Sequence, residues 1–224
     1  MEISFHAISA FVAALLAFAS GVKTWSHFRQ NDSLTVCYVF LVFFSMSMAM
    51  FLLVPPSLFK WSNILPPFFS ISVFFLFLGV AFFLRIVTSF LFFIKPFERV
   101  IFFLTVSTGA ALGVFTFLSG PSLEFGETGW NTVYRFNLAT KIVLSIFVII
   151  ITSLFSGITF LRKALFISMF VTKLRGLLVG AALLLIGIGV LLVVSGEGLI
   201  YNFFIVGAFT LFFISVSLFA PSKQ

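Results

Sequence analysis

Long apolar runs alternate in this sequence with short segments that carry nearly all of its charges. An α-helix needs about 20 apolar residues to cross the hydrocarbon core of a bilayer. Seven runs approach or reach that length, so we predict an all-α, polytopic membrane protein in which residues 1–224 form a single seven-helix transmembrane domain. The expected spans are about residues 3–22, 34–54, 66–84, 100–119, 141–160, 176–194 and 199–220.

The composition agrees with a membrane protein. Hydrophobic residues make up 62% of the chain and charged residues only 8%, which is far from the average of soluble domains. The 37 phenylalanines suit lipid-facing and bundle-facing positions and would promote aggregation on a water-exposed surface. The single cysteine, Cys37, excludes an intramolecular disulfide. Because Cys37 lies inside an apolar run, we interpret it as a small core side chain.

The segment Leu161–Arg175 predicts the orientation, because four cations lie there between two expected spans. Cytoplasmic loops keep an excess of Lys and Arg. This segment is therefore expected inside, and alternation then gives an outer N-terminus and a cytoplasmic C-terminus in a cell inner or plasma membrane. The inner side would hold Lys23, Arg29, Arg85, Lys95, Arg99, Arg162, Lys163, Lys173, Arg175 and Lys223, and the outer side only Lys60, Arg135 and Lys141.

Some of the inner cations are candidate contacts for a protein partner in the membrane or for anionic lipid. Each Lys or Arg near an anionic membrane surface contributes about 1 kcal/mol. The stretch Ala164–Val171 is apolar, so we expect this loop to lie along the inner surface. The candidates are Arg85, Arg162, Lys163, Lys173 and Arg175. The net charge of +7 does not predict a nucleic-acid partner, because the cations lie at span ends and form no patch on a folded domain.

Arg85 interrupts an apolar stretch that continues to Ile94. We place Arg85 at the inner interface, with Ile86–Ile94 continuing as a tilted or surface-lying helical piece. A long cationic side chain can reach the interface from such a position, and this interpretation is favoured over a gating or binding role.

The loop Pro121–Thr140 is the longest hydrophilic segment. It is expected outside, and its mixture of acids, aromatic residues and amides makes it the candidate recognition element, either a lid or a partner contact. The recognition residues would be Glu124, Glu127, Trp130, Asn131, Tyr134 and Arg135.

Small residues predict close helix packing in two of the spans. Gly109 and Gly113 lie four residues apart in the fourth, and Gly176 and Gly180 in the sixth. Such pairs create a flat strip on which another helix can approach. The segment Ser45–Met50, SMSMAM, allows a soft pocket lining, although ordinary helix packing is the favoured interpretation.

Two segments resemble each other within the chain. Phe11-Val12 precedes Ser20-Gly21 by the same spacing as Phe147-Val148 precedes Ser156-Gly157. A three-plus-one-plus-three arrangement with parallel repeats would explain this match. Coincidence between common residues is the alternative, and both interpretations stay open.

Motifs for catalysis or for a cofactor do not occur in the sequence. His6 and His27 fall on opposite sides of the predicted membrane, which rules out a shared metal or haem site. The last span has no lysine for a retinal Schiff base, and no span carries a central carboxylate for ion coupling. No phosphate-binding glycine loop and no Ser/His/Asp set on one side is present. We therefore expect a protein that is not an enzyme and has no catalytic residues, metal or cofactor.

The opening segment, AISAFVAALLAFASGVKTWSHFRQNDSLTVCYVFLVFFSMSMAMFLL, has a bare start, a basic and polar hinge, and an aromatic-rich second helix. In these features it resembles the seven-helix membrane sensor regions found N-terminal to bacterial histidine kinases. The resemblance implies a sensor module. No signalling domain follows Lys223 in the sequence, so a sensor of this kind is expected to act through a partner.

Three functions remain open. The first, which we favour, is a sensor or receptor-like module for a ligand or lipid, with recognition at the outer loop and a partner contact at the inner loop. The second is a structural subunit of a larger membrane complex. The third is a small transporter for an uncharged or lipidic substrate, in which the glycine-rich spans would let helices slide; the paired Pro-Gln signatures of small sugar transporters do not occur.

Overall fold

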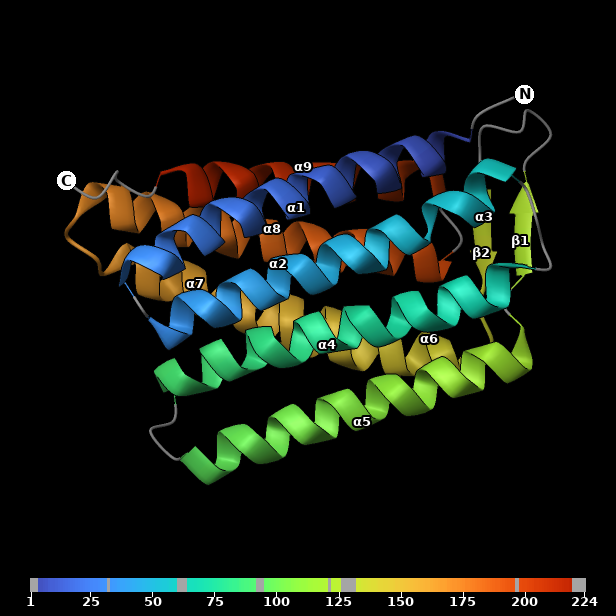
Figure 1. The fold of residues 1–224 in the computed structure, drawn as a ribbon, viewed down its shortest axis with the longest axis horizontal. Helices are drawn as coiled ribbons and strands as arrows, with labels where there is room; N and C mark the ends of the chain where they lie inside the picture. Colours follow the sequence, from blue (N-terminus) through green and yellow to red (C-terminus); the bar gives the residue numbers. More distant parts are fainter. Residues whose placement is uncertain are drawn as a thin grey trace.

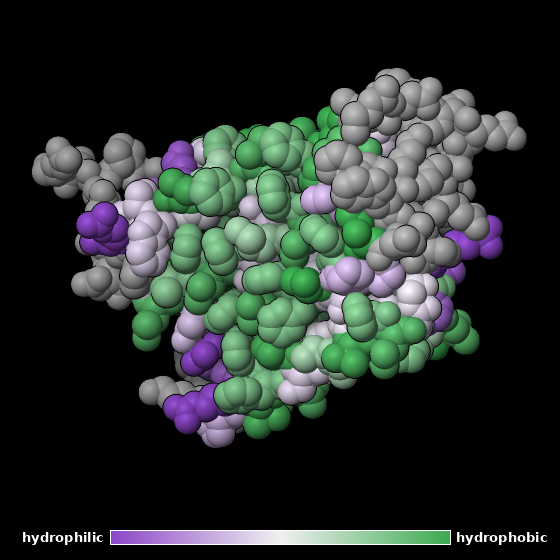
Figure 2. Space-filling model, turned by 45° about the vertical axis from the view of Figure 1, so that its right-hand side comes forward, coloured by the Kyte–Doolittle hydropathy of each residue, from purple (hydrophilic) through white to green (hydrophobic). Residues whose placement is uncertain are grey.

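The computed structural model describes residues 4–31, 33–59, 64–91, 95–120, 122–125, 132–195 and 198–218. Within them, seven helical segments are long and apolar enough to cross a membrane, and they lie side by side in one bundle (Figure 1). Apolar side chains fill the middle of the face seen in Figure 2, and hydrophilic ones lie toward its ends. The predicted class, an all-α multi-pass membrane protein with seven spans, is confirmed. The segments are Phe5–His27, Leu34–Leu58, Leu65–Thr88, Pro96–Ser119, Leu138–Leu165, Phe170–Ser195 and Ile200–Ser217.

The helices extend beyond the predicted spans at several ends. In chain order the elements are α1 (Phe5–Asn31), α2 (Leu34–Leu52), α3 (Val54–Phe59), α4 (Leu65–Leu91), α5 (Lys95–Ser119), β1 (Ser122–Phe125), β2 (Thr132–Arg135), α6 (Leu138–Leu144), the π-helix η2 (Ser145–Phe155), α7 (Ser156–Leu165), α8 (Phe170–Ser195) and α9 (Gly198–Ser217). The fifth span therefore joins α6, η2 and α7 into one rod.

The two ends of the bundle differ in the elements that lie there: one has the β-hairpin and the other the cationic α7–α8 turn. The start of α1 lies at the same end as the β-hairpin, which we call the hairpin end, and the end of α9 lies at the opposite end (Figure 1). The opposite end carries the α7–α8 turn with its cations, and we call it the basic end. An odd number of spans places the start of the first helix and the end of the last at opposite ends of the bundle. That the basic end faces the cytoplasm stays a prediction from the charges.

Six spans form a ring in cross-section. α1 packs against α2, α2 against α4, and α9 against both α1 and α8, while η2 and α7 pack against α8. The ring closes where α4 touches η2, which it does only briefly. α5 lies outside the ring against α4. The first three and the last three spans therefore form two neighbouring groups, with the fourth apart.

The two segments of the proposed repeat occupy matching places in these groups. A methyl group added at Gly21 would lie 3.5 Å from Phe43 Cβ of α2, and one added at Gly157 would lie 3.1 Å from Leu184 Cδ2 of α8. Each glycine thus faces the second helix of its own group. The repeat itself stays a prediction.

The helix α4 corrects the expectation for Arg85. It runs without a break to Leu91, and Ile86 and Val87 are buried in the bundle. The predicted helical continuation after Arg85 is therefore confirmed as far as Leu91, but its surface-lying alternative is wrong for these residues. The Arg85 guanidinium lies 4.6 Å from the centre of the Tyr38 ring and 5.7 Å from that of Phe102, within the range of cation–π interactions.

Helical structure also replaces much of the expected basic loop. α7 continues to Leu165 and α8 begins at Phe170, so only a short turn remains of the surface-lying loop that the sequence predicted. The two helices pack closely beside the turn, where a methyl group added at Gly176 would lie 2.7 Å from Ala164 Cβ. At the second span, α2 ends at Leu52 as the prolines predict, but the chain resumes as α3, with Pro55 and Pro56 in the first turn.

The outer loop contains an unexpected hairpin. β1 and β2 pair antiparallel, with Glu124 opposite Val133 and Leu123 opposite Tyr134. The strands contain the β-favouring residues Phe, Thr, Val and Tyr. Each strand is only four residues long, and polar residues separate them in the sequence, so the sequence analysis did not predict a hairpin.

Candidate ligand-binding cavity

A cavity of about 650 Å³ lies inside the ring of helices. Side chains from α2, α4, η2, α7, α8 and α9 line it, whereas the described parts of α1 and α5 contribute none. Sites for small molecules in proteins usually measure about 300–1,000 Å³. The cavity is thus large enough for a ligand, and the helices that enclose it come from both groups of three.

The cavity is long and narrow. Its lining on α2 runs from Thr35 near the basic end to Leu53 near the hairpin end, a separation of about 27 Å at about 1.5 Å per residue. Along α8 it runs from Thr172 to Val193. A volume of about 650 Å³ spread over that length leaves a thin space that suits an extended molecule better than a compact one.

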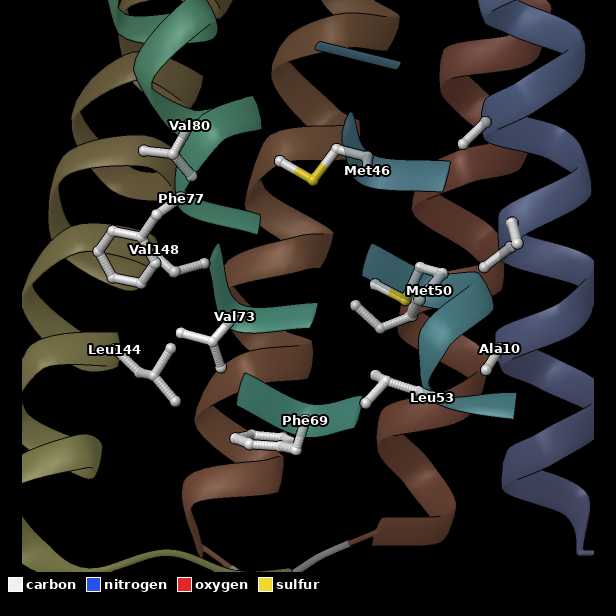
Figure 3. Packing of buried hydrophobic residues seen from close by; sticks show 14 of the residues in the cluster. Ala10, Met46, Met50, Leu53, Phe69, Val73, Phe77, Val80, Leu144 and Val148 are labelled. Atoms are coloured by element: carbon white, nitrogen blue, oxygen red, sulfur yellow. The ribbon is translucent and has the colours of Figure 1, made fainter. Parts of the chain in front are cut away.

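Apolar side chains form the middle of the cavity. Figure 3 shows Met46 of α2 at the level of Val80 of α4, Met50 at the level of Val73, and Val148 of the fifth span beyond α4. Both methionines belong to the buried core as well as to the lining. The segment Ser45–Met50 therefore takes part both in helix packing and in the lining of the cavity, which were the two interpretations of its sequence.

The basic end of the cavity is polar and cationic. Lys163 of α7 and Arg175 of α8 both line it. The Arg175 guanidinium donates a hydrogen bond to the backbone oxygen of Leu218, and Ser215 Oγ donates to the backbone oxygen of Arg175 at 3.4 Å. The hydroxyl-bearing lining residues at this end are Thr35, Thr159, Thr172 and Ser215.

Acidic residues do not line the cavity in the described chain. Glu98, the acid in the first turn of α5, belongs to a helix that lies outside the ring. Among the described lining residues, the charged side chains are therefore these two cations, and both lie at the basic end. Such an end favours a negatively charged group.

Aromatic residues lie near the hairpin end. Tyr201 of α9 lines the cavity and stacks on His6 of α1, with ring centres 5.8 Å apart. His6 Nδ1 lies 2.9 Å from Asn202 Oδ1, and Ser9 Oγ donates to the same oxygen at 2.6 Å. Reasoning from the sequence missed this buried cluster, because its members lie at opposite ends of the chain and share no local motif.

The π-helix η2 shapes one wall of the cavity. Thr152 Oγ1 donates to Phe147 O at 2.7 Å and Ser156 Oγ to Ile151 O at 3.1 Å, so each hydroxyl reaches back five residues. Val148 and Thr152 both line the cavity. The π-helix is rare in proteins, and its common single-turn form, the π-bulge, is frequently found at functional sites.

The five predicted inner-face cations divide into three groups. Lys163 and Arg175 line the cavity, whereas Arg162 is exposed and Lys173 is half-buried at the same end. Arg85 lies over aromatic rings of α2 and α5. The structure thus brings two of the five together at the cavity and leaves the others outside it.

The predicted outer recognition residues are only partly described. Glu124 lies in β1 and Tyr134 and Arg135 in β2, and β2 packs against α8 and α9 at the hairpin end. Arg135 is exposed. Glu127, Trp130 and Asn131 lie outside the described residues.

The four predicted packing glycines lie at close helix crossings. A methyl group added at Gly109 would lie 2.3 Å from Phe77 Cβ, and at Gly113 it would lie 3.2 Å from Ser70 O. Ser70 Oγ also donates to Gly113 O at 2.5 Å. Across the α7–α8 crossing, added methyl groups would lie 2.7 Å from Ala164 at Gly176 and 2.6 Å from Leu161 at Gly180.

Metal ligands do not gather in the described part of the chain, where no three His, Cys, Asp or Glu side chains come together. The fold and the cavity therefore define an integral membrane seven-helix bundle with an interior, mainly apolar cavity. Comparison with family models, with curated proteins and with solved structures finds no match for this chain.

Proposed function

We propose that this protein is a non-enzymatic, receptor-like seven-helix module that binds an apolar ligand in its cavity and reports ligand occupancy to a partner protein. The main observation in support of this proposal is the cavity. It is lined by five of the seven spans, so a ligand inside would contact helices of both groups. A ligand that binds one arrangement of these helices better than another shifts the bundle toward that arrangement.

The basic end offers a route from the cavity to a partner. Lys163 and Arg175 line the cavity from the two sides of the α7–α8 turn, and the turn itself exposes Phe166 and Phe170, which are 83% and 75% accessible. A change in cavity shape would move these exposed side chains. Together with Arg162 and Lys173 they form our proposed contact for a partner protein and for anionic lipid in a cell inner or plasma membrane.

The hairpin end is the proposed entry and recognition side. β2 packs against the ends of α8 and α9, and α9 begins beside Tyr201, which lines the cavity. A ligand that displaced the hairpin would therefore reach the lining directly. Within this proposal, Arg135 and the other predicted recognition residues of the hairpin loop select the ligand at this end.

The experiment is to compare a cavity-filling variant with a lipid-facing one. Val148→Phe adds a ring where the side chain is 1% accessible and lines the cavity, and Val114→Phe adds the same ring on α5, where the side chain is 61% accessible. Each protein is extracted in mild detergent and its mass is determined in the native state. We expect a bound small molecule on the natural protein and on Val114→Phe, and none on Val148→Phe.

A natural protein that folds without any bound molecule, and takes up none from added lipid, would overturn the proposal. Stable co-extraction of other proteins with an empty cavity would instead support a structural subunit of a larger complex. The same measurement therefore separates these two functions.

Transport is a second candidate, favoured by the length of the cavity. The lining reaches from Thr35 near one end to Tyr201 near the other, which a carrier for a lipidic substrate would need. Proteoliposomes loaded with the co-purified molecule decide between the two. Ligand-dependent labelling of the basic turn without flux supports the sensor, and flux that Val148→Phe abolishes supports the transporter.

A further inference from the structure

We propose that the ligand is a single-chain amphiphile with an anionic headgroup, held with its chain along the apolar part of the cavity and its headgroup beside Lys163 and Arg175. This inference rests on the proposed function, because it names the class of molecule that the same cavity binds.

The first argument is the distribution of charge along the cavity. Both of its cations lie at the basic end, and no acidic side chain in the described chain lines it. Arg175 is half-buried and Lys163 is exposed, and the attraction between opposite charges is stronger at a partly dehydrated site than in water. An anionic group at this end would lie near two cations and, among the described lining residues, near no carboxylate. A cationic amphiphile would be repelled by the same pair.

The second argument is the local chemistry at Arg175. The guanidinium donates to the backbone oxygen of Leu218 at the end of α9, which holds the side chain at the cavity wall. The N–H donors of a guanidinium form a planar fork that matches the oxygens of a carboxylate or a phosphate. Ser215 Oγ reaches its backbone acceptor only at 3.4 Å, so this hydroxyl can turn to a ligand oxygen at little cost.

The third argument is shape. The lining extends about 27 Å along α2 at about 1.5 Å per residue, and the volume is about 650 Å³. Met46, Met50 and Val148 supply apolar walls along this length (Figure 3). One extended alkyl chain fits along an elongated apolar space of this kind. Flexible methionine side chains also adapt to chains of different length.

The test compares two ligands with the same sixteen-carbon chain length, palmitate with an anionic carboxylate and cetyl alcohol with an uncharged hydroxyl. Binding to the detergent-purified full chain is measured by native mass spectrometry. We expect the natural protein to prefer palmitate at least about tenfold, which is the effect of one charge-assisted hydrogen bond. A monoacyl glycerol phosphate measured in parallel shows whether a phosphate headgroup is taken as well as a carboxylate.

Three variants locate the effect. Lys163→Gln combined with Arg175→Gln should remove the preference while cetyl alcohol still binds. Arg162→Gln removes an equal charge from the neighbouring exposed position, which does not line the cavity, and should keep the preference. Lys163→Glu, at an exposed position, should weaken palmitate binding and strengthen binding of cetylamine.

The outcomes separate this inference from the proposed function. Equal binding of palmitate and cetyl alcohol to the natural protein would overturn the proposal of an anionic headgroup, but it would still agree with the proposal that the cavity binds an apolar ligand. Loss of the preference in Arg162→Gln would also overturn it, because surface charge would then explain the effect. Binding of neither molecule, nor of the glycerol phosphate, would remove the proposed function as well.

Discussion

His6 Nδ1 lies 2.9 Å from Asn202 Oδ1 and thereby connects the first span with the last. Ser9 Oγ donates to the same amide oxygen at 2.6 Å. All three side chains are buried, so this polar cluster lies between α1 and α9 in otherwise apolar surroundings. It closes the ring on the side where the two groups of helices pack extensively.

Asn202→Ala should weaken this closure, because the acceptor shared by His6 and Ser9 is lost while both stay buried. Hydrogen bonds between helices in membranes contribute roughly 1 kcal/mol, and a lost acceptor can cost about 1–3 kcal/mol. We expect a lower Tm in detergent. Ser26→Ala is the control, because it removes a hydroxyl that is exposed and bonds only within its own helix. Equal Tm values for the two variants would contradict a structural role for the cluster.

Gly109→Ala should separate α4 from α5, because its new methyl group would lie 2.3 Å from Phe77 Cβ. Overpacking of this kind typically costs about 1–3 kcal/mol. Gly207→Ala is the matched control, since a methyl group there would meet only Leu185 Cδ1 at 3.7 Å. We expect thermal unfolding to show destabilisation at position 109 and none at 207. Similar Tm values would show that the α4–α5 crossing adapts freely.

Arg85 and Tyr38 should be energetically coupled, since the guanidinium lies 4.6 Å from the ring centre. Cation–π pairs contribute about 0.5–2 kcal/mol. A double-mutant cycle of Arg85→Gln and Tyr38→Leu measures this coupling in the free energy of unfolding. Strictly additive effects would mean that the two side chains are close without stabilising each other. Arg99→Gln, an exposed cation at the same end, controls for loss of charge alone.

The orientation predicted from the charges can be measured with single cysteines. In a Cys37→Ser background, Met169→Cys places a thiol in the α7–α8 turn and Ser119→Cys places one at the hairpin end, both at exposed positions. A membrane-impermeant thiol reagent should label position 119 from outside the cell and position 169 only after the cytoplasmic face is opened. The reverse pattern would invert the topology.

The sequence alone determined the number of spans and their approximate ends. Hydropathy is a local property, and about 20 apolar residues make a span whatever they pack against. The small residues at Gly109 and Gly180 were recognisable for the same reason, because close helix approach requires small side chains wherever it occurs. The prolines at 55 and 56 likewise marked the end of α2, since proline cannot continue a helix from within.

Only the tertiary structure decided which spans are neighbours. In lipid, the surface of a helix that faces the bilayer and the surface that faces the bundle are both apolar, so hydrophobic periodicity does not distinguish them. The pairing of His6 with Asn202 and the position of Arg85 over Tyr38 depend on packing between segments far apart in the sequence. That Lys163 and Arg175 line the same cavity depends on how the ring closes around it. The cavity itself is a property of the ring, and no single span encodes it.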